Sequence, residues 1–183
     1  MKYEINHLLK RDRGVESRSL HISYFIFHIF LLSGCYSFTG SSIPPHIHTI
    51  GIPGVEDNSG WGQSDVRQNL TDLLIQKFTN EGSLRVANRS NSDALLEASI
   101  APNGIIDEAV SVSVGEVVKD KRITLRVHAK YTDQKKQKVF WERDFSQTAN
   151  YQIIESLTGQ KKAIHQAEDQ VAEQIMIAVI SNW

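Results

Sequence analysis

Residues 122–131 alternate between polar and apolar side chains without a break, and the apolar members are Ile123, Leu125, Val127, Ala129 and Tyr131. Because successive side chains of a β-strand point to opposite faces of the sheet, this run predicts a strand with one packed face and one polar face. A polar loop at 133–138 and a second alternating run at 139–148 predict an antiparallel hairpin. Other elements must therefore cover one face of this hairpin.

Two helices are predicted from apolar residues at helical spacing, at about 64–80 and 159–180. The valines and serines at 110–118 indicate a further strand or an edge flap. The order β-α-β-β-β-β-α predicts an α+β fold whose antiparallel or mixed sheet packs both helices on one face. The other face is expected to be partly exposed or docked on a partner. Three shorter strands are predicted at 46–53, 84–88 and 94–101.

Cys35 is the only cysteine in the 183 residues, and it follows an apolar run that closes on small residues. This run has the length of a secretory signal and is shorter than the roughly 18–20 residues that span a bilayer. Leu32-Ser33-Gly34-Cys35 matches a bacterial lipobox, which predicts cleavage before Cys35 and a diacylglycerol thioether on its sulfur. The alternative is a buried structural cysteine in a short core helix, which Ser33 and Gly34 disfavour.

The lipobox divides the chain into three parts. We expect a lipoprotein signal peptide at 1–34, a lipidated cysteine with a flexible tether at 35–45, and one folded domain at 46–183. The segment before the apolar run is long and mixed in charge, and a true translation start after Met1 would shorten it. The mature chain is long enough to bury one core without disulfides.

The charge balance and the missing motifs exclude several functions. Without residues 1–34 the chain keeps 15 Lys and Arg against 18 Asp and Glu, which argues against nucleic acid as a partner. The sequence has no Gly-x-Ser-x-Gly elbow, His-Glu-x-x-His helix, P-loop or glycine-rich dinucleotide turn. We therefore expect no enzymatic activity, no catalytic residue and no cofactor.

A histidine pair and two tryptophans are candidate binding residues. On a strand, His46 and His48 would point both rings to one face, an arrangement that can begin a zinc site. The sequence offers no third ligand, so no metal is expected and a polar strand face is the preferred interpretation. Trp61 and Trp141 are candidate partner anchors, because tryptophan is frequent in binding hot spots. Core packing is the favoured role for Trp141, and the role of Trp61 stays open.

Five short segments follow one another behind the lipobox at residues 34–40, 47–53, 70–86, 92–98 and 139–142. In this order and spacing they resemble the LptE family of lipopolysaccharide-assembly lipoproteins, in its Bacteroidetes-type form. The resemblance covers residues 35–183. Each segment is short and mostly apolar, so the order and spacing carry the resemblance rather than any single motif.

The resemblance implies an outer-membrane lipoprotein that faces the periplasm. It would plug an LptD-like β-barrel, assist the assembly of that barrel and support lipopolysaccharide transport to the cell surface. Its partners would be the barrel, the membrane through the lipid anchor, and lipopolysaccharide. The alternatives are a generic periplasmic lipoprotein that binds another envelope protein or a small ligand, and a hydrolase without a recognisable motif.

The resemblance also implies contact with lipopolysaccharide through basic side chains, since phosphorylated headgroups favour Lys and Arg. The alternative is an ordinary solvated hairpin whose charges prevent edge pairing. The candidates cluster in the sequence around the long hairpin and are Lys119, Lys121, Arg122, Arg126, Lys130, Lys135, Lys136 and Lys138.

Overall fold

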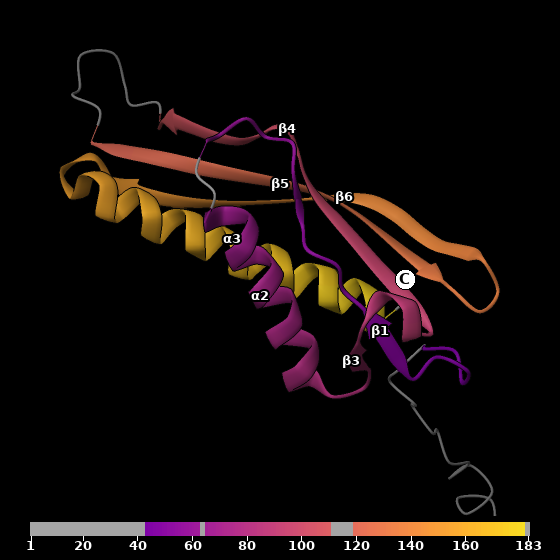
Figure 1. The fold of residues 1–183 in the computed structure, drawn as a ribbon. Coiled ribbons are helices and arrows are strands. Elements are labelled where there is room, and N and C mark those ends of the chain that lie inside the picture. The colour runs from indigo at the N-terminus through magenta and orange to yellow at the C-terminus, as the bar shows by residue number, and fades with distance from the viewer. Residues whose placement is uncertain (1–42, 63–64, 111–118, 182–183) are drawn as a thin grey trace, which may run out of the picture. The chain divides into compact units, whose positions relative to one another are not determined.

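The structure is a computed structural model that describes residues 43–62, 65–110 and 119–181 (Figure 1). The predicted signal peptide, Cys35, most of the tether and the valine–serine run at 111–118 lie outside the described residues. The elements in chain order are β1 (Thr49–Gly51), β2 (Glu56–Asp57), α2 (Asp65–Glu81), β3 (Arg85–Ala87), the 3-10 turn η1 (Arg89–Asn91), β4 (Ala94–Ala109), β5 (Asp120–Asp133), β6 (Lys138–Gln152), the 3-10 turn η2 (Ile153–Glu155) and α3 (Ser156–Ser181).

The described strands form one mixed sheet in the order β3-β1-β4-β5-β6, with β2 paired to β4. β4, β5 and β6 are antiparallel to one another, whereas β1 is parallel to both of its neighbours, β3 and β4. The parallel pairing of β1 with β3 follows from α2, which lies between them in sequence and returns the chain to the same end of the sheet. The predicted α+β fold with a mixed sheet and two helices is confirmed.

Both helices lie on the same face of the sheet (Figure 1). α2 directs Val66, Leu70, Leu74 and Phe78 into the core, at helical spacing. Lys77 on α2 forms ion pairs with Asp169 and Glu173 on α3, at 2.9 and 3.0 Å. The buried residues of α3 and the inner face of β5 complete the core, and these include Ala167, Val171, Ile175, Val179, Ile123, Leu125, Val127 and Ala129.

The hairpin of β5 and β6 has the predicted alternation and is longer than predicted at both ends. Val127 lies opposite Phe145 and Tyr131 opposite Trp141, so the inner rows of the two strands face each other in register. The register shifts once, between Tyr131 and Thr132. The predicted polar face and packed face of β5 are both present.

β4 continues to Ala109, although its end was predicted at Ala101. The pairing with β5 shifts register between Ile100 and Ile105, which is the signature of a bulge. Asn103 has φ of 51°, and a Cβ on Gly104 would lie 2.6 Å from the Ala101 carbonyl oxygen. The bulge therefore requires a residue without a Cβ at position 104. Beyond the bulge, β4 pairs with β5 again.

The first two strands differ from what the sequence predicts. β1 has three residues instead of the eight predicted at 46–53. β2 was missed, because its residues, Glu56 and Asp57, show no apolar alternation and lie in a segment predicted to be a loop. Only its pairing with Ser99 and Ile100 on β4 identifies it as a strand.

Candidate docking surface

The face of the sheet turned away from α2 and α3 is largely polar, and no helix of the described residues covers it (Figure 1). We call this surface the open face. It consists of the residues that alternate with the core-facing ones on the three long strands, and of these Thr124 is itself buried. On β5 and β6 these are Arg122, Thr124, Arg126, His128, Lys130, Glu142, Asp144, Ser146, Thr148 and Asn150.

His128 is the centre of an ion network on the open face. Its Nδ1 lies 2.7 Å from Asp144 Oδ1, and its Nε2 lies 3.0 Å from Glu142 Oε1. The hydrogen bond to Asp144, and after it the one to Glu142, raises the pKa of His128, since both carboxylates favour the imidazolium. Lys130 adds a weaker contact with Glu142 at 3.8 Å. Opposite charges thus face each other across β5 and β6.

A shallow cavity of about 220 Å³ lies on the open face beside this network. Arg89 and Glu97, which form an ion pair at 2.9 Å, line one part of it. His128, Lys130 and Glu142 line another part. The cavity therefore presents balanced charges, which suits docking on a polar surface better than capture of an apolar ligand.

The eight basic candidates do not form one cluster in space. Lys119, Lys121 and Arg122 lie at the start of β5, whereas Lys135, Lys136 and Lys138 belong to the turn at its other end. Arg126 and Lys130 lie between them on the open face. With about 3.3 Å per residue, the 14 residues of β5 separate the two groups by roughly 45 Å.

Lys121 faces the helices and is engaged there. Its Nζ lies 3.3 Å from Asp107 Oδ2, and Asp107 also accepts hydrogen bonds from the Tyr151 hydroxyl and from Gln160 Nε2. The hydrogen bond to Asp107 raises the pKa of Lys121. Lys121 therefore ties the end of the sheet to the start of α3.

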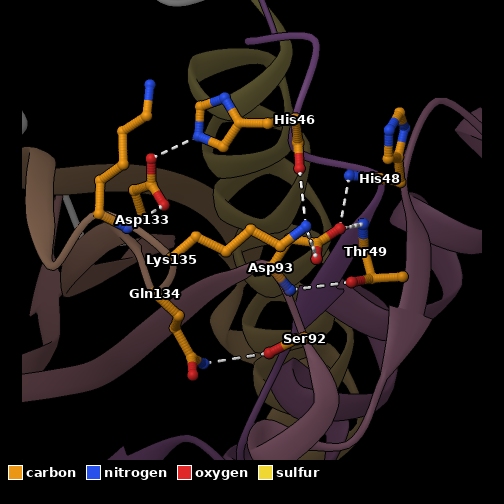
Figure 2. A network of polar contacts seen from close by, with 9 residues as sticks. His46, His48, Thr49, Ser92, Asp93, Asp133, Gln134 and Lys135 are labelled. Carbon is orange, nitrogen blue, oxygen red and sulfur yellow. Dashed lines mark hydrogen bonds and ion pairs between the residues drawn. The ribbon is translucent and has the colours of Figure 1, made fainter.

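Lys135 is also engaged within the fold, in a network that we call the clasp (Figure 2). Its Nζ lies 2.7 Å from Asp93 Oδ1 and donates a hydrogen bond to the His46 carbonyl oxygen. Asp93 Oδ2 accepts hydrogen bonds from the amides of His48 and Thr49 at 2.8 and 3.0 Å. The Lys135 contact, followed by the His48 amide, holds the pKa of Asp93 well below its ordinary value.

The second half of the clasp joins His46 to Asp133. His46 Nε2 lies 2.7 Å from Asp133 Oδ2, and Asp133 Oδ1 accepts a hydrogen bond from the Lys136 amide. Burial acts to raise the pKa of Asp133, yet these contacts outweigh it and the pKa is lowered. His48 is exposed. Across the described ranges, no three His, Cys, Asp or Glu side chains are placed to share a metal ion.

The sequence profile of the LptE family, described as lipopolysaccharide-assembly, matches residues 47–179 of this chain. The chain belongs to the LptE family. This match runs from β1 to the last turns of α3, so it includes the open face and most of the clasp. No curated protein sequence matches the chain.

Solved structures share the fold of this LptE-family chain at low sequence identity. A Xanthomonas campestris protein of the family DUF330 is 18% identical, with a TM-score of 0.54, and the match covers 79% of this chain and 90% of that one. Lipoprotein B from Nitrosomonas europaea is 13% identical, with a TM-score of 0.53 and coverage of 74% and 83%. Rare lipoprotein B from Shewanella oneidensis is 11% identical, with a TM-score of 0.50 and coverage of 71% and 92%. These likenesses support the fold.

Trp61 and Trp141 of this LptE-family domain pack inward. Trp141 is 8% exposed and contacts Tyr131 and Phe145, with ring centroids 5.8 and 5.7 Å apart, so its predicted core role is confirmed. The Arg143 guanidinium lies 4.8 Å from its ring centre. Trp61 is partly buried against the core. In the part of the chain that the structure describes, no helix has both the length and the hydropathy that a membrane crossing requires.

Sequence reasoning missed the acidic partners that decide the roles of the lysines. Asp93 and Asp133 lie 40 residues apart in sequence, and only the pairing of β4 with β5 brings them to the same end of the sheet. The available signals were that Asp93 comes just before one predicted strand and Asp133 just after another. Neither signal indicates which residue the aspartate contacts.

Proposed function

We propose that this LptE-family protein is an outer-membrane lipoprotein, acylated at Cys35 and facing the periplasm. Its domain docks in the lumen of an LptD-like β-barrel, assists assembly of that barrel and supports delivery of lipopolysaccharide to the cell surface. The role is that of a plug and does not involve catalysis. Membership of the lipopolysaccharide-assembly family is the observation that carries this proposal.

The open face is the surface proposed to meet the barrel wall. The lumen of a transmembrane barrel is lined by polar side chains, which an exposed sheet face with paired charges matches. His128 with Asp144 and Lys130 with Glu142 supply such paired charges over the middle of the face. Docking of this kind depends on complementary surfaces and needs no reacting group.

Basic residues away from the turn, whose side chains form no ion pair or hydrogen bond with a described residue, are proposed to meet lipopolysaccharide phosphates. Lys121 and Lys135 are excluded from this role by their ion pairs with Asp107 and Asp93. Arg122 donates a hydrogen bond to Asn150 and Lys130 contacts Glu142, so these two are engaged as well. Lys136 and Lys138 belong to the turn, and the residues proposed for this contact are Lys119 and Arg126.

Co-purification tests the proposed partner. Extraction of the tagged full-length protein in mild detergent is expected to bring along a large outer-membrane barrel protein. The double variant Arg122→Glu, Lys130→Glu is expected to lower the yield of that protein severalfold, because it reverses charge on the open face. The control variant Lys161→Glu, Lys162→Glu makes the same change in net charge on exposed residues of α3 and should leave the yield unchanged.

Two results would contradict the proposal. Reproducible absence of a barrel protein would favour a generic periplasmic lipoprotein with another envelope partner or a small ligand. Depletion of the protein without accumulation of lipopolysaccharide beneath the cell surface would remove the transport role.

A further inference from the structure

The clasp fixes the place where the N-terminal segment joins the domain. Lys135 donates to the carbonyl oxygen of His46, and the His46 ring bonds to Asp133, so residues 46–48 are held against the turn between β5 and β6 (Figure 2). Asp93 accepts hydrogen bonds from the backbone amides of His48 and Thr49. We call this end of the sheet, with the turn and the clasp, the hairpin end.

The hairpin end is where the chain that leads to Cys35 joins the described domain. Seven residues lie between Cys35 and Ile43, the first described residue, and the eight steps of about 3.5 Å reach at most roughly 28 Å. The opposite end of the sheet, where β6 ends and α3 begins, is farther away by the length of β5, about 45 Å. An anchor on Cys35 can therefore lie within about 28 Å of the hairpin end, whereas this reach falls short of the opposite end.

The surface of the hairpin end is positively charged because its acids are turned inward. Asp133 is 1% exposed, and Asp93 is occupied by Lys135 and two amides. Lys136 and Lys138 are exposed and form no ion pair with a described residue. Such an excess of cations is attracted to a layer of anionic headgroups.

The opposite end of the sheet has a different surface. Three exposed lysines and the partly exposed Arg122 are interspersed there with three exposed acids, so most of the charges at this end are balanced. Ile154 and Leu157, which are 89% and 68% exposed, form an aliphatic tip beside them. The exposed lysines and acids are Lys119, Lys161, Lys162, Glu108, Asp120 and Glu155.

We propose that the hairpin end rests on the headgroup layer of the membrane that holds the lipidated Cys35. Lys136 and Lys138 contact the phosphates of anionic phospholipids, while Lys135 and Asp93 keep the tether against the turn. This inference rests on the proposed acylation of Cys35. It gives the domain a defined orientation, with the aliphatic tip pointing away from that leaflet.

Site-specific quenching tests the orientation. The full-length acylated protein is placed in vesicles of phosphatidylethanolamine and phosphatidylglycerol that contain headgroup-spin-labelled lipid and no lipopolysaccharide. Acylation consumes the only native thiol, so a fluorophore can be attached at Val139→Cys near the turn, or at Ile154→Cys at the opposite end. Quenching is expected to be severalfold stronger at position 139 than at position 154.

Charge variants identify the contact. Lys136→Glu, Lys138→Glu should lower the quenching at position 139, since each lysine near an anionic surface is worth about a fivefold change in bound fraction. Lys161→Glu, Lys162→Glu, with the same charge change at the opposite end, should leave it unchanged. Vesicles of phosphatidylcholine alone should give the low value with every variant.

Three outcomes would overturn the inference. Equal quenching at both positions means that the domain lies flat, and stronger quenching at 154 means that the aliphatic tip is inserted. Quenching at 139 that appears only when lipopolysaccharide is added assigns the lysines to that lipid instead. Mass spectrometry of the same sample reports acylation of Cys35, so failure of the proposed anchoring is recognised separately.

Discussion

Glu168 on α3 is fully buried, and its two carboxylate oxygens have no hydrogen bond of good geometry with a described residue. Burial, with a smaller contribution from Asp65, raises its pKa to about 8, and the nearby Asn69 amide offsets this only in part. Glu168 is therefore mostly protonated in the folded protein at neutral pH. It lines a cavity of about 160 Å³ between α2 and α3.

This raised pKa predicts how stability depends on pH. Between pH 4.5 and about 8 the unfolded chain releases the Glu168 proton while the folded chain keeps it, so this residue makes the free energy of unfolding fall as pH rises. The slope it adds is at most about 1.4 kcal/mol per pH unit. Glu168→Gln should remove that slope and stabilise the protein most near pH 8, as measured by urea unfolding at pH 5 and 8. An unchanged difference between the two pH values would show that Glu168 titrates normally.

The clasp predicts that Asp93 contributes to stability through its charge. Asp93→Asn removes the acceptor of the Lys135 ion pair and weakens the bonds to two amides, and should lower the free energy of unfolding by about 1–3 kcal/mol at pH 7. Because the pKa of Asp93 is lowered on folding, this contribution is present above the ordinary aspartate pKa and is lost as the solution becomes strongly acidic.

The control for Asp93→Asn is Asp144→Asn, which also removes one carboxylate from a pair. The Asp144 side chain is 80% exposed, so its contact with His128 should contribute less than about 1 kcal/mol. Equal losses in the two variants would mean that the clasp is no stronger than a surface ion pair.

Among the elements, β4 shows where local patterns mislead. Pro102-Asn103-Gly104 is a typical strand end in sequence, and the prediction stopped at Ala101. In the sheet these residues form a bulge, because β5 continues alongside and pairs again from Ile105. The hairpin and both helices were predictable, since their apolar periodicity is long and regular.

The bulge gives a prediction for Gly104. An alanine Cβ would lie 2.6 Å from the Ala101 carbonyl oxygen and 2.8 Å from that of Arg126, so Gly104→Ala should destabilise the protein by roughly 1–3 kcal/mol. Gly54→Ala is the matched control, because nothing lies within 4 Å of its Cβ position. Urea midpoints of the two variants measure the difference. Similar midpoints would mean that β4 adjusts at the bulge without cost.

At the scale of the whole molecule, the sequence predicted a sheet with one covered and one polar face. It did not predict which charges on or around that sheet are free. Lys135 and Lys136 are neighbours in sequence, yet Lys135 is bound to Asp93 while Lys136 points to solvent. Lys119 and Lys138 belong to one hairpin, yet a whole strand separates them. Long-range strand pairing decides these differences, and no local pattern records it.

The position of β1 also determines when this sheet can be completed. β1 comes first among the described strands but lies between β3 and β4, and the segment before it is held by Asp133 and Lys135. In a chain that emerges N-terminus first, Thr49 to Gly51 must wait for about forty later residues, as far as Leu95, before all their strand partners exist. His46 must wait for about ninety, as far as Lys135. Contacts of such high sequence separation form slowly. The segment at 46–51 is therefore expected to be among the last to fold, and the one most in need of protection while it waits.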